Sequence, residues 1–229
     1  MRRAMLLIVG LGTGGLLLFA LCTGAAAQYA HLQEQQRTRM LPGAVQGTFL
    51  QAVQLAAYEG PFWEDGTAEE AADVAALVVE NTGGCYVSEG AVVLDWGEDR
   101  MVFELSWLPP GGKVLVLEKH RKPYRDIGDG ACYGWASELY PENTGVVTVE
   151  QTGSAGLAFT NRTDGAIDGA AAMYKHYDQE SGMYIGGITY SISVADLQPG
   201  ESRTVTPWRY AAGYSRVVCV MTDVWNFSE

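Results

Sequence analysis

The sequence has 229 residues and carries 27 Asp and Glu against 15 Lys and Arg, a formal net charge of −12. So acidic a chain repels phosphate backbones, which excludes the usual nucleic-acid-binding classes. The length allows one large or two small domains with a sizeable core.

Residues 1–27 are predicted to form a transmembrane signal-anchor. Arg2 and Arg3 precede an apolar run, residues 4–27, that contains no charged side chain. As a helix this run would be about 36 Å long, enough to cross a hydrocarbon core of about 30 Å. The two arginines predict a cytoplasmic N-terminus, with the rest of the chain outside the plasma membrane.

A cleaved signal peptide is the alternative. Ala25-Ala26-Ala27 before Gln28 has the small-residue pattern of a cleavage site, although the apolar run exceeds the usual h-region of about 7–15 residues. Both alternatives export the remainder, which keeps 13 Lys and Arg against all 27 acids, a net charge of −14. Such acidity is typical of a soluble exported surface.

Residues 28–60 are predicted to form a helical stalk. Residues 28–40 are polar and rich in helix formers, and residues 44–58 place apolar side chains near helical spacing. Gly60-Pro61 ends this pattern, and residues 61–73, which are acidic and small, are expected to form a linker.

From Val74 onward the sequence is typical of β-structure, because short apolar runs alternate with turn residues. Residues 100–107 alternate apolar and polar positions, and residues 114–117 are apolar on both faces, as in a central strand. Residues 183–194 form a long predicted strand with a bend or bulge at Gly186-Gly187, and residues 178–182 form a hairpin loop before it.

An internal repeat divides this β region. Each copy has a strand that ends in Asn, then further strands, a Leu-x-Pro-Gly turn and a last strand. The Asn and Leu are Asn81 and Leu108 in the first copy, and Asn161 and Leu197 in the second. We therefore expect two tandem antiparallel β-sandwiches, residues 74–140 and 141–229.

The second copy resembles the FxLYD-type, immunoglobulin-like domains of Gram-positive surface proteins. The resemblance rests on residues 157–161, on Tyr177-Asp178 with Gly182, and on residues 197–202; it covers about residues 146–221, and more faintly 74–118. The Phe-x-Leu-Tyr-Asp string of the family name is absent. The resemblance implies an exported, anchored β-sandwich and says little about activity.

The exported cysteines are Cys85, Cys132 and Cys219, and an oxidising compartment would permit a disulfide between two of them. His31 and His176 are expected at the surface. His120 followed by Cys219 has the order of a sortase-like cysteine transpeptidase, but no Arg or Lys follows Cys219 to stabilise an oxyanion. We expect Cys219, between two valines, to be a buried strand residue.

No metal or cofactor is predicted. The sequence lacks zinc spacing, a nucleophile elbow and a phosphate-binding loop. The acids that could gather around Ca²⁺ have no loop spacing that supports such a site; they are Asp164, Asp168, Asp178 and Glu180. The sequences that begin at Asn161 and Asn226 are glycosylation sequons.

Aromatic residues and arginines, which favour binding interfaces, gather in one segment of the second copy. The candidate ligand-binding residues are Trp208, Arg209, Tyr210, Tyr214 and Arg216. The alternative is that Trp208 and Tyr214 alternate into the core. A second group, which could seal the contact between the sandwiches, comprises Tyr133, Trp135 and Tyr140.

The sequence thus favours a non-catalytic, membrane-anchored surface protein that binds a protein or a cell-wall polymer. The alternative function is a carbohydrate-binding module that uses the same aromatics as a platform, and a sortase-like enzyme is the second alternative.

Overall fold

The computed structural model describes residues 38–64, 67–97, 99–125, 130–141 and 145–222. Thirteen strands and no helix occur among these residues, which confirms the prediction of a mainly β chain. The strands are β1 (Thr38–Ala44), β2 (Leu50–Glu64), β3 (Thr67–Asn81), β4 (Tyr86–Asp95), β5 (Arg100–Leu108), β6 (Lys113–Leu117), β7 (Ala131–Leu139), β8 (Val147–Thr152), β9 (Gly156–Asn161), β10 (Ile167–Asp178), β11 (Met183–Leu197), β12 (Ser202–Val205) and β13 (Ser215–Thr222).

The chain divides into two compact units, residues 1–39 and 40–229, and nearly all of the described residues belong to the second. The predicted membrane segment, residues 4–27, and the first part of the predicted stalk lie outside the described residues. Within the described part of the chain, no helix has the length and apolarity needed to span a membrane.

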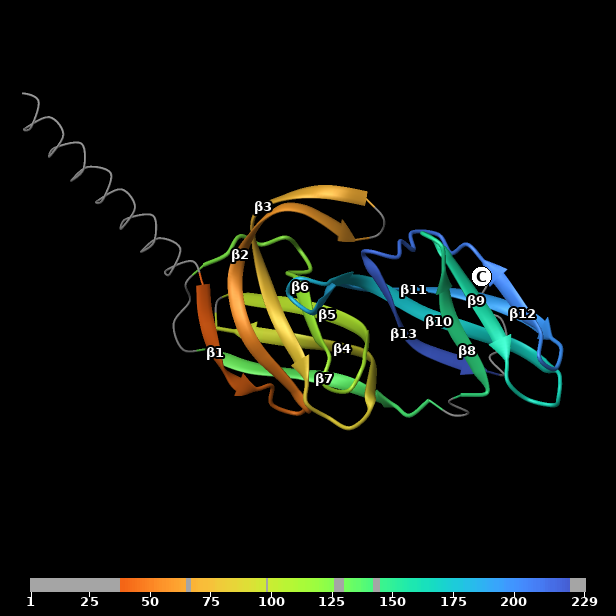
Figure 1. The fold of residues 1–229 in the computed structure, drawn as a ribbon. Coiled ribbons are helices and arrows are strands. Elements are labelled where there is room, and N and C mark those ends of the chain that lie inside the picture. The colour runs from red at the N-terminus through yellow and green to blue at the C-terminus, as the bar shows by residue number, and fades with distance from the viewer. Residues whose placement is uncertain (1–37, 65–66, 98, 126–129, 142–144, 223–229) are drawn as a thin grey trace, which may run out of the picture. The chain divides into compact units, whose positions relative to one another are not determined.

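The strands form one seven-stranded sheet, β1-β2-β3-β6-β11-β10-β13, and two three-stranded sheets, β5-β4-β7 and β12-β9-β8 (Figure 1). We call the part with β1–β7 the first half and the part with β8–β13 the second half. Each half contains the same six-strand pattern. Neighbours β2-β3-β6 and β5-β4-β7 in the first half correspond to β8-β9-β12 and β11-β10-β13 in the second.

The two asparagines of the sequence repeat make the same hydrogen bonds at the same place in each half. Both side chains are fully buried. The Asn81 amide donates to the carbonyls of Cys85 (2.8 Å) and Leu108 (3.0 Å). The Asn161 amide donates to those of Gly165 (2.7 Å) and Leu197 (3.1 Å). Each asparagine therefore ties the end of its strand to the loop four residues on and to the Leu of its Leu-x-Pro-Gly turn.

The two Leu-x-Pro-Gly turns also have matching backbones. Gly112 N–H donates to Pro109 C=O at 2.9 Å, and Glu201 N–H donates to Gln198 C=O at 2.9 Å. Gly111 (φ 68°) and Gly200 (φ 69°) occupy the turn position that requires positive φ, which L side chains rarely adopt. The sequence repeat is thus a repeat of hydrogen-bonded geometry, and the longer β10–β11 hairpin accounts for the different spacing of its members.

The halves are joined rather than merely adjacent in sequence. Strands β6 and β11 pair in parallel, with Val114 opposite Tyr184 and Leu115 opposite Ile185. The buried cluster of the first half also includes Met173, Tyr184, Val218 and Cys219 from the second half. A second cluster lies within the second half. Two fully separate sandwiches would not share a core in this way. The predicted tandem arrangement therefore has to include a paired strand and a shared core between its two halves.

Lys175 of β10 lies at this junction, and sequence reasoning overlooked it. Its side chain is fully buried. The ammonium donates to the carbonyls of Ser106 (3.0 Å), Gly187 (3.1 Å) and Ile188 (2.9 Å), and to the Thr189 hydroxyl (3.1 Å). These acceptors come from β5 and from a wide bulge of β11, where residues 186–189 lie opposite Lys175. The buried charge therefore holds β5, β10 and β11 together.

The strand patterns expected from the sequence are confirmed at three places. Met101, Phe103 and Leu105 of β5 are buried on one face, although Trp107 (φ 47°) breaks the alternation. Strand β6 is apolar on both faces because Val114 and Val116 join the main cluster while Leu115 and Leu117 pack under the β2–β3 hairpin. The hairpin loop at residues 178–182 and the bulge at Gly186-Gly187 are both present.

The predictions of a helical stalk and of a linker are wrong for the residues that the structure describes. Residues 50–64 form β2, and residues 67–81 form β3, its antiparallel partner. The apolar side chains whose spacing suggested a helix do not share one buried face, because Leu50 is buried whereas Val53 and Ala56 are only partly buried. A bulge between Ala52 and Gln54 also interrupts the alternation of β2. The expected linker contains Phe62 and Ala71, which are buried.

We predict that N81D and N161D each lower the free energy of unfolding by about 2–4 kcal/mol, because each places a carboxylate against carbonyl oxygens that now accept hydrogen bonds. Chemical denaturation measures this change. Q198A, which alters an exposed side chain in the same turn, is the control. Losses below about 0.5 kcal/mol would show that the asparagine bonds are dispensable.

We further expect K175M to destabilise the protein by about 2–4 kcal/mol, because it keeps the apolar stem but leaves several buried carbonyls without a donor. K113M is the matched control: Lys113 forms only a half-exposed ion pair with Glu80, so its loss should cost less than about 1 kcal/mol. Equal stability losses in the two variants, measured by denaturant titration, would contradict a special role for Lys175.

Candidate functional site

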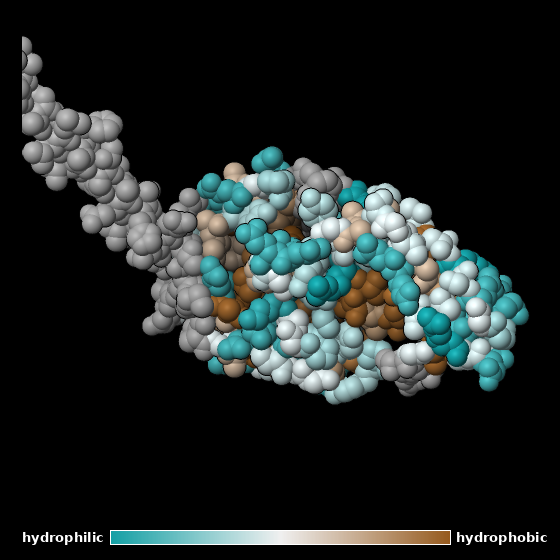
Figure 2. Space-filling model, viewed as in Figure 1, coloured by the Kyte–Doolittle hydropathy of each residue, from teal (hydrophilic) through white to brown (hydrophobic). Residues whose placement is uncertain are grey.

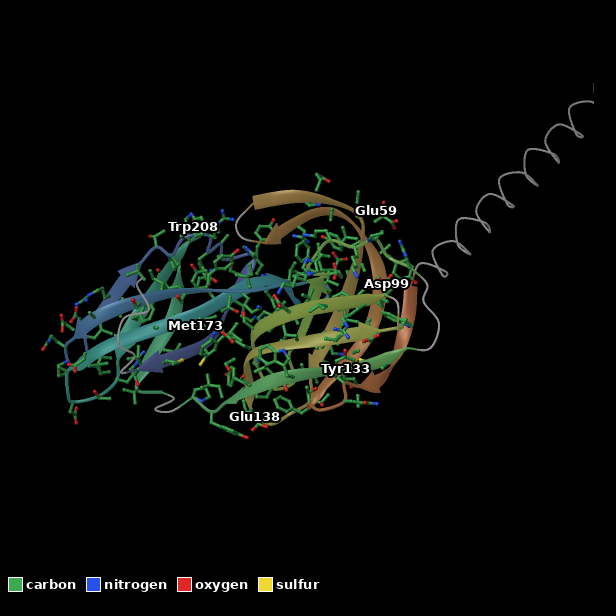
Figure 3. The ribbon with its side chains drawn as sticks, turned by 180° about the vertical axis from the view of Figure 1, so that it is seen from behind. Glu59, Asp99, Tyr133, Glu138, Met173 and Trp208 are labelled. Atoms are coloured by element: carbon green, nitrogen blue, oxygen red, sulfur yellow. The ribbon has the colours of Figure 1, made fainter. Side chains whose placement is uncertain are left out.

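The predicted ligand-binding residues lie in or next to the segment between β12 and β13. Trp208 is 67% exposed and Tyr214 is 74% exposed, whereas Tyr210 is buried. The alternative that Trp208 and Tyr214 alternate into the core is therefore wrong. The physical reason is that residues 206–214 form turns rather than a strand, so side chains do not alternate between two faces. Figure 3 shows Trp208 at the margin of the second half, while Met173 lies within it.

Buried tyrosines anchor this segment to the sheet beneath. The Tyr174 hydroxyl donates to the Trp208 carbonyl, and burial raises the pKa of Tyr174 to about 12. The Tyr174 ring meets Tyr210 edge-on at 5.6 Å between centroids and stacks with Tyr190 at 5.7 Å. Tyr190 in turn meets Trp208 edge-on at 6.3 Å. The exposed Trp208 is thus held by three tyrosines in a fixed orientation.

Two arginines of the segment lie over aromatic rings. The Arg209 guanidinium carbon is 3.9 Å from the centroid of Trp208, and that of Arg216 is 3.7 Å from the centroid of Tyr177. Cation–π contacts of this kind fix the plane of the guanidinium group. Arg209 also has φ 63°, a conformation that is costly for a non-glycine residue.

A cavity of about 640 Å³ opens between this segment and the β10–β11 hairpin. Its wall is mainly aromatic and aliphatic, with one arginine and one carboxylate; the chief residues are Tyr177, Asp178, Ile185, Arg209, Tyr210 and Tyr214. We call this cavity and its rim residues Trp208 and Arg216 the aromatic–arginine patch. Three of the five predicted site residues line this cavity, and the other two, Trp208 and Arg216, contact the lining residues Arg209 and Tyr177.

The patch carries two fixed positive charges and one negative charge. Burial lowers the pKa of His176, so its imidazole is neutral at pH 7 and adds no charge. Hydrogen bonds from the Ser181 hydroxyl, and from the backbone N–H groups of Ser181 and Glu180, lower the pKa of Asp178. That carboxylate is consequently ionised but occupied by its own hairpin loop.

The cysteines do not form the predicted disulfide: Cys85, Cys132 and Cys219 are all free. They occupy separate elements. Cys85 lies in the loop before β4, and its carbonyl accepts a hydrogen bond from Asn81. Cys132 lies on β7 opposite Leu94, and Cys219 lies on β13 opposite Met173. Each strand position is already fixed by its own sheet pairing, so no bridge is needed to hold it.

The geometry gives no support to a cysteine nucleophile. Cys219 is buried, as expected from its flanking valines, and burial raises its pKa to about 11. A thiol with that pKa is almost wholly protonated at neutral pH, whereas the attacking species is the thiolate. His120 lies exposed in the turn after β6, and no contact between His120 and Cys219 is found among the described residues. His31 lies outside them, and His176 is half-buried rather than at the surface.

The four acids considered for Ca²⁺ do not form a site. Asp178 caps its own turn, accepting hydrogen bonds from Glu180 N–H (3.3 Å) and Ser181 N–H (3.1 Å). Across the described part of the chain, no group of three or more His, Cys, Asp or Glu side chains is placed to hold a metal ion.

The glycosylation sequon at Asn161 is closed to modification in the folded protein, because that amide is buried and hydrogen-bonded. Asn226 lies outside the described residues.

The second aromatic group lies on and just after β7 in the first half and does not form a single patch. Tyr133 donates a hydrogen bond to Asp95 at 3.1 Å, and Tyr140 donates one to Glu138 at 3.3 Å. Trp135, which is 51% exposed, borders a different cavity of about 690 Å³. Polar and charged side chains, among them Glu89, Glu104 and Lys119, line much of that cavity.

Hydrophobic surface is also visible over β13 (Figure 2). A shallow cavity of about 360 Å³ lies there, lined by residues 217–220 and by Val147 and Val149 of β8. It contains no charged side chain and no strained backbone. The aromatic–arginine patch is the more specific candidate because it combines exposed rings, oriented cations and a cavity.

Comparison with known proteins found no relative of this chain: no protein-family model, curated protein or solved structure matches it.

We predict that Cys85 and Cys219 resist alkylation in the folded protein at pH 8, whereas half-buried Cys132 reacts slowly and all three react in denaturant. Burial and raised pKa values limit the thiolate at Cys132 and Cys219. Mass spectrometry after treatment with iodoacetamide checks this order. Rapid labelling of Cys219 in the folded protein would reopen the possibility of a reactive thiol.

Proposed function

We propose that this chain is a non-catalytic, membrane-anchored cell-surface protein. Residues 1–27 anchor it to the plasma membrane, and two joined β-sandwiches, the second of FxLYD-like type, stand on the outer side. The aromatic–arginine patch of the second half binds a partner, either a protein or a cell-wall polymer. No cofactor is required for this function.

The observation that carries the proposal is the exposure of Trp208 and Tyr214 on a rigid base. Keeping a large aromatic side chain exposed forgoes the stabilisation that its burial would give. Trp, Tyr and Arg are also the residues that contribute most binding energy at protein interfaces. Here the exposed rings flank a cavity instead of filling it. Tyr174, Tyr190 and Tyr210 hold the segment in place, so little conformational entropy remains to be lost on binding.

A carbohydrate-binding module is the second candidate, because Tyr214 offers a free ring to a sugar. Trp208 is less available, since Arg209 covers one face of its ring at 3.9 Å. Nothing in the patch supports the sortase-like alternative: Cys219 is on β13 and is buried.

The proposed location and the proposed surface can be tested together with G213C and Y140C. Gly213 lies next to the patch, is exposed and has open space for a side chain, and Tyr140 is 67% exposed. In intact cells a membrane-impermeant maleimide should label both positions. It should label G213C several-fold more slowly in cells than in the purified full-length protein, because a partner covers the patch, whereas Y140C should react equally in both.

Protection of both cysteines in intact cells would contradict the outward location. Equal labelling of G213C in cells and in the purified protein would contradict a partner at the patch. Release of the protection by wall-digesting enzymes would identify the partner as a wall polymer.

A further inference from the structure

We infer that the partner of the aromatic–arginine patch is an acidic peptide segment in which a carboxylate lies next to a bulky apolar side chain. This inference rests on the proposed function and names its ligand class. Three features support it: the conformation of Arg209, the nature of the cavity and the charges around it.

Arg209 is held in a costly arrangement with spare hydrogen-bonding capacity. Its φ of 63° lies in the left-handed region, which disfavours residues with a Cβ. Its Nε is buried and has no hydrogen-bond partner among the described residues. Strain of this kind persists where the surrounding structure imposes it, and such strain concentrates at binding sites.

The stacking of Arg209 prepares it to bind an anion. Its guanidinium carbon lies 3.9 Å from the centroid of Trp208, and the side chain lines the cavity, so the cation is held at the cavity wall. A planar guanidinium edge matches the two oxygens of a carboxylate. No ion pair of Arg209 or Arg216 with an acidic side chain is found in the described ranges, although other surface arginines such as Arg100 and Arg203 have one.

The cavity beside this cation indicates the rest of the ligand. Ile185, Tyr177, Tyr210 and Tyr214 give it a largely apolar wall, and about 640 Å³ is ample for an aromatic or leucine side chain. A hydrophilic glycan would leave that apolar wall unfilled. The neighbouring Asp178 carboxylate offsets part of the positive charge of the two arginines, which disfavours a highly charged polyanion. One carboxylate next to one apolar anchor satisfies all of these conditions.

A random-peptide library selected on the purified full-length protein tests the inference. We expect the enriched peptides to pair Asp or Glu with Phe, Trp or Leu. A synthetic version of the best peptide should lose at least about tenfold in affinity when its acid is replaced by Asn or Gln, as expected for a charge-assisted bidentate contact.

R209Q should cause a similar loss of peptide binding, and R162Q, at an exposed arginine of the same half, should cause none. R209G serves as the folding control, because glycine accepts φ 63°. This variant should keep or raise the melting temperature while losing peptide affinity.

Three results would overturn the inference: no enrichment of acidic peptides, enriched peptides that R209Q does not weaken, or tighter binding of an acidic polysaccharide than of any peptide. If the patch is nevertheless protected on cells in the G213C experiment, the proposed function stands and only the ligand class is wrong. If the patch is not protected on cells either, the proposed function and the proposed ligand class are both wrong.

Discussion

The structure depends on a fully buried positive charge. An ammonium group removed from water must be surrounded by acceptors, and Lys175 obtains them from the Ser106 carbonyl and from the bulge of β11. The bulge in turn exists because Gly187 allows β11 to approach β5 so closely that a Cβ would lie 2.2 Å from the Glu104 carbonyl oxygen. This one requirement fixes the register of β10 against β11 and joins the first half to the second.

The same requirement positions the candidate site. His176 and Tyr177 follow Lys175 on β10, and Ile185 directly precedes the bulge on β11. The walls of the cavity are therefore set by the strands that flank the buried Lys175, while the segment after β12 supplies the exposed rings and arginines. Binding surfaces gain precision when loops are backed by such a base.

Much of this architecture could be predicted from the sequence, and the failures have identifiable causes. The Asn and Leu-x-Pro-Gly pattern predicted a repeat because buried amides and positive-φ turns accept few other residues. Residues 44–58 were misleading because their apolar side chains fall near helical spacing, while the positions that β2 buries there, Leu50, Ala52 and Leu55, do not follow that spacing. Lys175 gave no signal, since a single lysine among Tyr174, His176 and Tyr177 is normally a surface residue. The exposure of Trp208 depended on a turn that alternation rules do not describe.

The parallel contact between β6 and β11 has a mechanical consequence. In a chain tethered through its N-terminus and holding a partner through the second half, tension between cell and partner would cross from one half to the other. It would pass through two residue pairs, the shared core and the bonds of Lys175, while the β2–β3 and β10–β11 hairpins lie on either side. The junction, rather than either half, would then set the force at which the protein first yields.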